Sequence, residues 1–498
     1  MKREMFRKLM AASLATVMAM SVVGCGSEDA GASSAESKDS ATESSSAVES
    51  TEESSSVEEN VDPYPVLTDE NGNVYDLGGM EIVIRDWWSN KDNGTDGFEY
   101  TENDYGEATK EYHEWLQETY NFTIRRESIS DWGSAPQDFV DYVTTGGDEN
   151  NYVFVLRQDA AITSAMGQGL MYDLATLKSF DFSEDKWKSG VHELMSKGDS
   201  IYCMSPYDPE PRTGVFFNKR LISEAGMDAQ ELYDLQENME WTWDKFEEIC
   251  AKVQRDTDSD GTIDIYALDM NDSNLYNAAV FSNGGEYVGM ENGQYTYRLE
   301  DEETLAGLEW GVKMMQTYTK TLDENGEAPA WDYYKDAFIN GNIVFCVEDA
   351  YAAGAAGSGA PWAEMADDYG FLCFPMGPSA SDYTNRYSDN PIAIPACYDA
   401  DKAEKIAFAF NVMTDPTPGY EDYPAWRAGY YAKFRDTESV DLTLTRMVSN
   451  GMVTYDGLIP NLQLGSDLTW KLGSTPVSEV VEGIAETWKS YIAEANGQ

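Results

Sequence analysis

Strand and helix patterns alternate along residues 80–156, and this alternation restricts the possible fold more than any other feature of the chain. Met80–Arg85 and Phe122–Ile124 are strand-like, and a helical pattern with an aromatic face, Ala108–Tyr120, lies between them. A further helical pattern ends at a Gly-Gly pair. It is followed by Tyr152–Leu156, a continuous apolar run typical of a strand buried on both faces of a parallel sheet. The order predicts an α/β sheet with helical crossovers.

Charge and composition restrict the class of function. The chain has 498 residues, with 90 acidic against 34 basic residues and a formal net charge of −56. Nucleic acids and anionic membranes are held by Lys and Arg, so this balance argues against both as partners. With only two His residues, His-based metal or general-base chemistry is also disfavoured. Because 12% of the residues are aromatic, the remaining classes are an acidic, Trp- and Tyr-rich binding protein or a carboxylate enzyme.

The N-terminus predicts export and lipid anchoring. A basic start is followed by the short apolar run Leu9–Val23 and then by Gly24-Cys25, the pattern of a secretory signal comprising residues 1–24. Val22-Val23-Gly24-Cys25 resembles the bacterial lipobox, whose Cys is lipidated and becomes the first residue of the mature protein. The alternative is an ordinary signal with an incidental Cys. We therefore predict lipidation, including palmitate, at Cys25, and a location on the extracellular face of the bacterial cell membrane.

Residues 25–62 are predicted to form a tether between this anchor and a globular body. Between residues 26 and 62 the chain is rich in Ser and Glu, with eleven acidic residues and one Lys. So little apolar surface cannot offset the entropy cost of ordering, and we expect disorder. The other five cysteines, at positions 203, 250, 346, 373 and 397, are odd in number and include no C-x-x-C pair. They are interpreted as free, mostly buried thiols.

Six short motifs, in order along the chain, resemble those of one protein family. They are Gly167–Leu174; Gly198–Tyr202; Gly214–Lys219 with Glu224–Gly226 and Trp243–Phe246; Ser282–Gly285; Phe338–Phe345; and Thr475–Val481. Each is weak alone, but together they resemble the extracellular solute-binding proteins of the carbohydrate-uptake group (family 1-like), the substrate-capturing lipoproteins of bacterial ABC transporters. The resemblance extends over about residues 80–496.

The resemblance implies an α/β, two-lobed fold of the periplasmic-binding-protein type (type II). In this fold crossing hinge strands join the lobes and the ligand cleft lies between them. We place the first lobe at residues 76–205 and 343–396, and the second at 206–342 and 397–498. The implied function is capture of an oligosaccharide or other carbohydrate by hinge closure, followed by delivery to the permease subunits of an ABC importer. The implied partners are a carbohydrate, that permease and the membrane through the lipid anchor alone, and the expected state is a monomer.

Candidate ligand-binding residues lie just past the predicted strand ends. A sugar ring offers apolar faces to aromatic rings, and its hydroxyls pair with amides, carboxylates or Arg. The candidates are Asp86, Trp87 and Trp88 after the first strand; Gln158 and Asp159 after Tyr152–Leu156; Glu348, Asp349 and Tyr351 after Ile343–Val347; and Trp426 and Arg427 in an aromatic loop after a helix at Lys402–Met413. Trp331, Trp362 and Trp470 are further candidates for rings on which a sugar stacks. Core packing is the alternative for each Trp, and helix N-capping is the alternative for Asp159 and Asp349.

Residues 256–264 predict a calcium site. Asp256, Asp258, Asp260 and Asp264 occupy positions 1, 3, 5 and 9 of an EF-hand-type loop, with Gly261 at position 6, and Thr262 supplies a carbonyl at position 7. Ala267 stands at position 12 in place of the usual bidentate Glu, so a sixth ligand has to come from water or elsewhere. Some members of the resembled family carry a similar loop with structural calcium. The alternative is a solvated Asp-rich turn.

Two rival functions stay open from the sequence. A surface-anchored glycoside hydrolase needs only two well-placed carboxylates, and 90 acidic residues provide many pairs by chance. A binding protein for a peptide or another non-sugar solute would have the same fold. No G-x-S-x-G, H-E-x-x-H, P-loop or dinucleotide motif occurs in the chain. His113 and His192 lie in amphipathic stretches and are expected to pack or to face solvent. We therefore expect a binding protein without catalytic residues.

Overall fold

The computed structural model describes residues 64–89, 100–128, 131, 133–157, 165–187, 190–205, 212–322, 329–386 and 390–497. All of these belong to one compact unit, Asp62–Gln498. They form two four-stranded sheets, which we call the first and the second sheet, together with three short two-stranded sheets. No helix in these ranges is long and apolar enough to cross a membrane.

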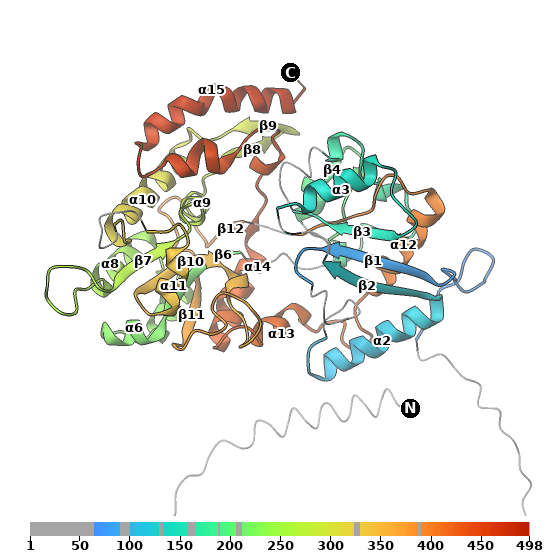
Figure 1. Cartoon of the computed structure of the whole chain (residues 1–498), viewed down its shortest axis with the longest axis horizontal. Helices are drawn as coiled ribbons and strands as arrows, with labels where there is room; N and C mark the ends of the chain where they lie inside the picture. Colours follow the sequence, from blue (N-terminus) through green and yellow to red (C-terminus); the bar gives the residue numbers. More distant parts are fainter. Residues whose placement is uncertain are drawn as a thin grey trace, which may run out of the picture. The chain divides into compact units, whose positions relative to one another are not determined.

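The first sheet confirms the strand and helix alternation expected for residues 80–156. Its strand order is β13-β3-β1-β2, with β1 (Met80–Asp86), β2 (Phe122–Ser128) and β3 (Asn151–Val155) parallel and β13 (Ile392–Ala393) antiparallel at the edge. Helices α2 (Asp104–Tyr120) and α3 (Ala135–Thr144) make the two crossovers, as Figure 1 shows.

Helix α2 illustrates how the sequence defines these elements. The Asn103 side chain caps its start by accepting a hydrogen bond from the backbone N–H of Gly106. Asn121 ends the helix in the left-handed conformation, with φ = 54°. The buried face includes Tyr112, Leu116 and Tyr120, the expected stripe, and it packs against the first sheet.

The second sheet is mixed, with strand order β11-β6-β10-β7. The central strand β10 (Ile343–Asp349) runs parallel to β7 (Tyr266–Met270) and antiparallel to β6 (Thr213–Asn218), and β11 (Tyr369–Cys373) is antiparallel to β6. Apart from its last residue, β10 is buried throughout, as expected for a strand covered on both faces. The helices in this part of the chain are α6 (Lys219–Glu224), α7 (Ala229–Glu237), α8 (Trp243–Val253), α9 (Asp272–Ser282), α10 (Glu302–Tyr318) and α11 (Tyr333–Ile339).

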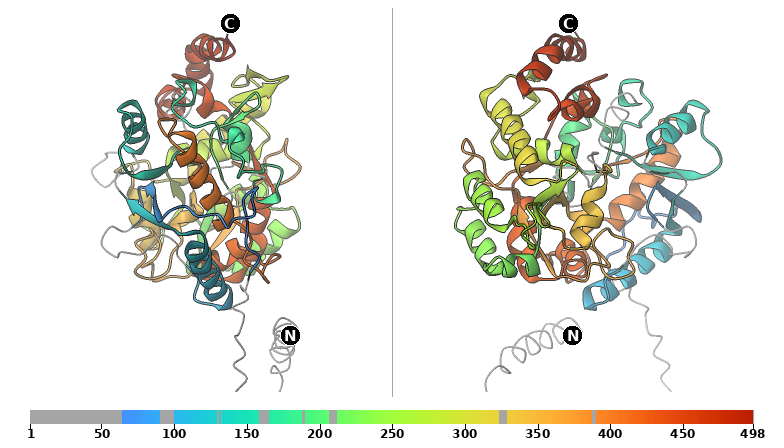
Figure 2. Two further views of the ribbon diagram at one scale, coloured as in Figure 1. Left: turned by 90° about the vertical axis from the view of Figure 1, so that its right-hand side faces the viewer. Right: turned by 60° about the vertical axis from the view of Figure 1, so that its left-hand side comes forward.

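The remaining elements are shorter or lie towards the C-terminus. The short strands are β4 (Ser196–Lys197), β5 (Ser200–Ile201), β8 (Val288–Glu291), β9 (Gln294–Tyr297), β12 (Asn385–Arg386) and β14 (Gly451–Met452). The helices are α5 (Gly190–Leu194), α12 (Ala400–Met413), α13 (Ala425–Tyr431), α14 (Thr445–Ser449) and α15 (Val477–Ala495). The last of these lies beside hairpin β8–β9 (Figures 1 and 2), where the Asn496 amide exchanges two hydrogen bonds with the Tyr295 backbone.

Each large sheet has its own hydrophobic core, and the assignment of residues to the cores corrects the expected domain boundaries. Strands β10 and β11, placed with the first lobe, pair with β6 in the second sheet. Helix α12, placed with the second lobe, packs through Ala403, Ile406 and Phe410 into the core of the first sheet. The reason is that an apolar strand is compatible with either sheet, and only pairing between distant residues decides which one it joins. The described core residues between Leu77 and Met204, and those of Ile392–Ala396, do lie with the first sheet.

Candidate functional site

The end of β10 holds two neighbouring carboxylates in different surroundings. Glu348 is 4% exposed and accepts hydrogen bonds from the Asn274 amide (3.0 Å), the Tyr334 hydroxyl (2.8 Å) and the backbone N–H of Asp349 (2.9 Å). Burial raises the pKa of the Glu348 carboxyl, and the nearby Asp349 charge adds to the rise. A carboxylate enclosed in this way orients its neighbours more readily than it contacts a solute.

Asp349 faces a cavity that opens at this edge of the second sheet. It accepts a 2.7 Å hydrogen bond from the Thr213 hydroxyl, and its other oxygen lies 3.9 Å from the Arg212 guanidinium. Although Asp349 precedes a short 3₁₀ turn, its side chain makes no capping hydrogen bond. The cavity measures about 120 Å³, and its polar lining residues are Arg212, Thr213, Asn274, Asn277, Asp349, Thr384, Asn385 and Arg386. Guanidinium, amide, hydroxyl and carboxylate groups of this kind suit a hydroxyl-rich guest.

Tyr351, two residues after Asp349, supplies an aromatic ring near Asp349 and Arg212, which line this cavity. It is 47% exposed, and burial of part of its ring together with the charges of Glu348 and Asp349 raises the pKa of its hydroxyl. The Arg212 guanidinium is near enough to lower the same pKa. An exposed ring beside a polar cavity is the arrangement that stacking on a sugar face requires.

The end of β1 presents an aromatic pair. Asp86 is 1% exposed and accepts hydrogen bonds from the backbone N–H (3.0 Å) and hydroxyl (2.5 Å) of Ser89; Arg126 lies 3.3 Å away. Its carboxylate is therefore occupied within the protein. Trp87 is half-buried against the core of the first sheet and contacts Trp88 edge to face, with ring centroids 4.9 Å apart. Trp88 is 52% exposed, so of these three predicted residues it is the one with a ring open to a ligand.

The remaining aromatic candidates fall into three groups. Trp362 is completely buried in the core of the second sheet and cannot be a platform, which corrects that expectation. Trp331 and Trp470 are strongly exposed. Trp426 and Arg427 lie in helix α13, not in a loop; Trp426 packs against the core of the second sheet, and Arg427 lies 3.9 Å from Asp441. Gln158, Asp159 and Cys25 fall outside the described residues.

The structure adds polar residues that the sequence reasoning missed, chiefly Arg212, Asn274, Asn277 and Arg386. A signal for one of them existed, because Asn274 lies shortly after the end of β7, as the other candidates follow their strands. That strand was not recognised. Arg386 belongs to the two-residue strand β12, which is too short to leave a periodic pattern.

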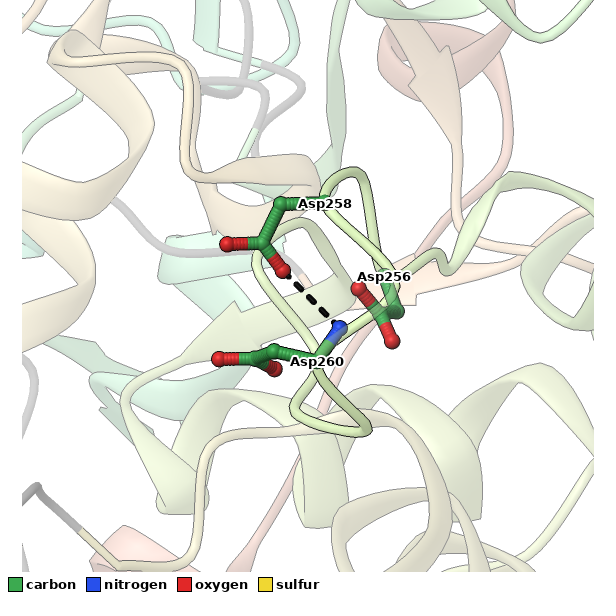
Figure 3. A group of neighbouring side chains, drawn as sticks. All are labelled: Asp256, Asp258 and Asp260. Atoms are coloured by element: carbon green, nitrogen blue, oxygen red, sulfur yellow. Dashed lines mark hydrogen bonds between the residues drawn. The ribbon is translucent and has the colours of Figure 1, made fainter.

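The Asp-rich loop brings three of its predicted ligands together. Oxygen atoms of Asp256, Asp258 and Asp260 lie within 4.8 Å of one another (Figure 3). Backbone N–H groups order these side chains: the N–H of Gly261 donates to Asp256 (2.8 Å), and that of Asp260 donates to Asp258 (3.0 Å). Gly261 has φ = 95°, a backbone conformation that residues other than Gly rarely adopt. Three oxygens held this close fit a hard cation such as Ca²⁺.

The other two predicted calcium ligands are arranged differently. Asp264 is not part of the cluster of three; it accepts hydrogen bonds from the backbone N–H (2.7 Å) and hydroxyl (2.5 Å) of Thr257. These bonds lower the pKa of the Asp264 carboxyl, the hydroxyl contributing most. Thr262 donates its backbone N–H to Asp260 at 2.7 Å, which holds the residue at position 7 against the cluster.

His113 and His192 both serve in packing. Burial lowers the pKa of each imidazole to about 4, so both are neutral at pH 7. His113 lies 3.0 Å from the Tyr100 hydroxyl, and His192 contacts the rings of Phe182 and Trp187. Cys203, Cys250, Cys346 and Cys373 are buried and free, and Cys397 is free and half-buried, which confirms the interpretation of the thiols.

The sequence was compared with models of protein families and with curated proteins. Residues 136–412, more than half of the chain, match the model of a family described as bacterial extracellular solute-binding protein. No curated protein shows significant sequence similarity to the chain.

Three solved structures illustrate the similarity of fold. The GacH receptor of Streptomyces glaucescens GLA.O, determined unliganded and with acarbose, is 14% identical (TM-score 0.53; 83% of this chain and 99% of that one). Maltose-bound MalE3 of T. maritima is 16% identical, with a TM-score of 0.53, and the match covers 82% of this chain and 99% of that one. UgpB of Mycobacterium tuberculosis, in complex with glycerophosphocholine, is 15% identical, with a TM-score of 0.55, and the match covers 78% of this chain and 95% of that one. At such low identity these likenesses show the fold alone: an α/β, two-lobed binding-protein fold.

Proposed function

Because the chain belongs to the family of bacterial extracellular solute-binding proteins, we propose that it captures a carbohydrate between its two lobes and delivers it to the permease of an ABC importer. The observation that carries the proposal is the exposed Tyr351 ring beside a cavity lined by Arg212, Asn274 and Asp349. A ring and planar polar groups at one edge match the apolar faces and the hydroxyls of a sugar. The acarbose- and maltose-bound neighbours favour the same class of solute.

Two other functions are alternatives. The glycerophosphocholine complex of UgpB favours a non-sugar solute as the second candidate. A glycoside hydrolase would need two carboxylates on either side of a substrate bond. The two carboxylates at the end of β10 do not suit that task, because Glu348 is enclosed by Asn274 and Tyr334. We therefore propose binding without chemical change.

A ligand panel tests the proposal. The full chain would be screened by thermal shift against neutral and acidic oligosaccharides, glycerophosphocholine and short peptides, and the hits measured by calorimetry. A solute at 100 times its Kd should add about 2.7 kcal/mol to the free energy of unfolding. The expected result is a shift with at least one oligosaccharide, which is recovered intact. Binding to glycerophosphocholine or peptides alone would overturn the carbohydrate assignment, and cleavage of the bound sugar would favour the hydrolase.

Closure and oligomeric state have their own tests. We propose that the two lobes close on the solute by hinge motion and that the protein acts as a monomer. Small-angle scattering with the best ligand of the panel should give a smaller radius of gyration than without it. An unchanged profile at saturation would contradict closure. A dimer in light scattering, at the concentration used for calorimetry, would contradict the monomer.

We propose that the loop at residues 256–264 binds structural calcium through Asp256, Asp258 and Asp260, with the Thr262 carbonyl and Asp264 completing the site. The support is the EF-hand-like spacing and the 4.8 Å grouping of the three carboxylates. Calcium should raise the thermal midpoint of the chelator-treated protein, and Asp258→Asn should remove the effect. A matched control is Asp69→Asn in the short acidic turn at residues 69–73, which should leave the calcium response unchanged.

We propose that the protein is a lipoprotein anchored through Cys25 to the outer face of the cell membrane. The support is the lipobox-like sequence and the polar, acidic residues 26–62 that follow it. Labelling of cells with radioactive palmitate should mark the wild-type protein. Cys25→Ala should abolish the label and release the protein into the medium. Label that persists in Cys25→Ala would contradict the assignment of the modified residue.

A further inference from the structure

The cavity at the end of β10 contains two guanidinium groups, and each faces a carboxylate. Arg212 lies 3.9 Å from Asp349, and Arg386 lies 3.7 Å from Asp456, which is buried. Each positive charge is therefore balanced by a negative one nearby. The cavity consequently has strong local dipoles but no surplus of positive charge with which to attract an anion.

The asparagine amides of the cavity offer a ligand both hydrogen-bond donors and hydrogen-bond acceptors. The Asn277 carbonyl oxygen accepts a 2.9 Å bond from the Tyr287 hydroxyl, which leaves its NH₂ group as a donor for a ligand. Asn274 donates its NH₂ to Glu348, and Asn385 donates its NH₂ to the Met447 carbonyl, which leaves their oxygens as acceptors. A hydroxyl group donates and accepts, whereas a carboxylate only accepts. The mixed set therefore suits hydroxyls.

The size of the cavity limits what it can hold. Its volume is about 120 Å³, whereas pockets that enclose a whole drug-sized ligand measure roughly 300–1,000 Å³. It is too small for a whole oligosaccharide, so at most one unit fits inside it and further units would lie outside.

Resting on the carbohydrate binding proposed above, we infer that this cavity accepts one uncharged, hydroxyl-bearing unit of the solute and discriminates against the same unit carrying a carboxylate. An acidic unit would compete with Asp349 and Asp456 for the two arginines and add a third negative charge to the group. The net charge of −56 on the chain opposes such a guest at longer range as well.

Matched neutral and acidic ligands test this discrimination. Calorimetry on the full chain would compare maltotetraose, cellotetraose and mannotetraose, each with its form oxidised at C6 to the uronate. For any pair that binds, the neutral member should bind at least about tenfold more tightly. Equal or tighter binding of an acidic member would overturn this inference and leave carbohydrate binding intact. Failure of all six sugars would overturn the carbohydrate assignment, and the inference with it.

Variants locate the discrimination in the cavity. Asp456→Asn removes the charge that balances Arg386 and should weaken the preference for the neutral sugar by about tenfold. Arg386→Gln removes one of the two positive charges and leaves Asp456 without its cationic partner, and it should strengthen that preference instead. The matched control is Asp367→Asn, which breaks the 2.9 Å pair with Arg220 near Asn218, at the opposite end of β6, and should leave the preference unchanged. An unchanged preference in both cavity variants would contradict the role of charge balance.

Discussion

The ends of β1 and β10 are built on the same plan but present different chemistry. In both, a carboxylate is enclosed by hydrogen bonds, Asp86 with Ser89 and Glu348 with Asn274 and Tyr334. In both, an aromatic ring just beyond the strand stays open, Trp88 in one and Tyr351 in the other. Among the described residues, the cavity and its balanced arginines lie at the β10 end. The buried carboxylates thus accept hydrogen bonds from groups beside each strand end, and within the part of the chain that the structure describes it is the β10 end that gathers polar groups suited to hydroxyls.

Replacing the enclosed carboxylate of β10 should have the largest effect. Glu348→Ala leaves the Asn274 amide, the Tyr334 hydroxyl and a backbone N–H without their acceptor, at a cost of about 3 kcal/mol in the free energy of unfolding. Solute affinity should fall too, because Asn274 lines the cavity. Urea denaturation and calorimetry measure the two effects. Glu348→Gln keeps one acceptor oxygen and should lie between wild type and Ala; a fully stable Glu348→Ala would contradict the structural role.

Removing Asp349, the half-buried neighbour of that carboxylate, should separate recognition from stability. Asp349→Ala takes away a charged acceptor at the cavity and should weaken binding of the solute by about 30- to 100-fold. The thermal midpoint should change little, because Asp349 is only half-buried. Asp368→Ala, which removes an exposed carboxylate 3.8 Å from Arg435, is the matched control and should bind normally. If both variants bound like wild type, the cavity would not be the solute site.

The same two strand ends show how far the sequence alone reaches. The sequence predicts a strand at Met80–Arg85 and helices at residues 108–120 and 402–413, and the structure has them at Met80–Asp86, 104–120 and 400–413, because periodicity is a local signal. The exposure of a ring is less predictable: position after a strand selects Trp88 and also its half-buried neighbour Trp87. The assignment of β10 to the second sheet was not predictable, since it depends on pairing with the distant β6 and β7. Arg386 was missed for a similar reason: tertiary packing alone brings it to the cavity.

Burial lowers the pKa of one titratable group, His113, and raises that of another, Asp269. The two groups should therefore make the stability respond to pH in opposite directions. His113, in helix α2 beside the first sheet, has a pKa of about 4 when folded against about 6.5 when unfolded. The unfolded chain therefore takes up more protons in acid, and stability falls as the pH drops from 6.5 towards 4. Asp269, on β7, has a pKa of about 7, raised mainly by burial. Its unfolded form releases the proton first, so its contribution to stability falls as the pH rises from about 4 to 7.

Two variants separate these contributions. His113→Gln should reduce the loss of unfolding free energy between pH 7.5 and 5 by about 1–2 kcal/mol. Asp269→Asn should raise stability at pH 7.5 relative to wild type, and more so than at pH 5, because the amide needs no proton to stay neutral. Urea denaturation at the two pH values measures both. If the two variants shifted the pH profile in the same direction, the assignment of opposite signs would be wrong.

The smallest expected effect concerns the two open rings. Trp88→Ala removes a ring that is 52% exposed, so the thermal midpoint should hardly change, while loss of stacking on a sugar face should weaken binding by about three- to tenfold. Trp88→Phe keeps an aromatic face and should recover most of the loss. Tyr351→Ala is the counterpart on the second sheet. If both rings hold the solute, each Ala variant weakens binding; a loss in Tyr351→Ala alone would mean that the second sheet supplies the ring as well as the polar groups, and that Trp88 is exposed for another reason.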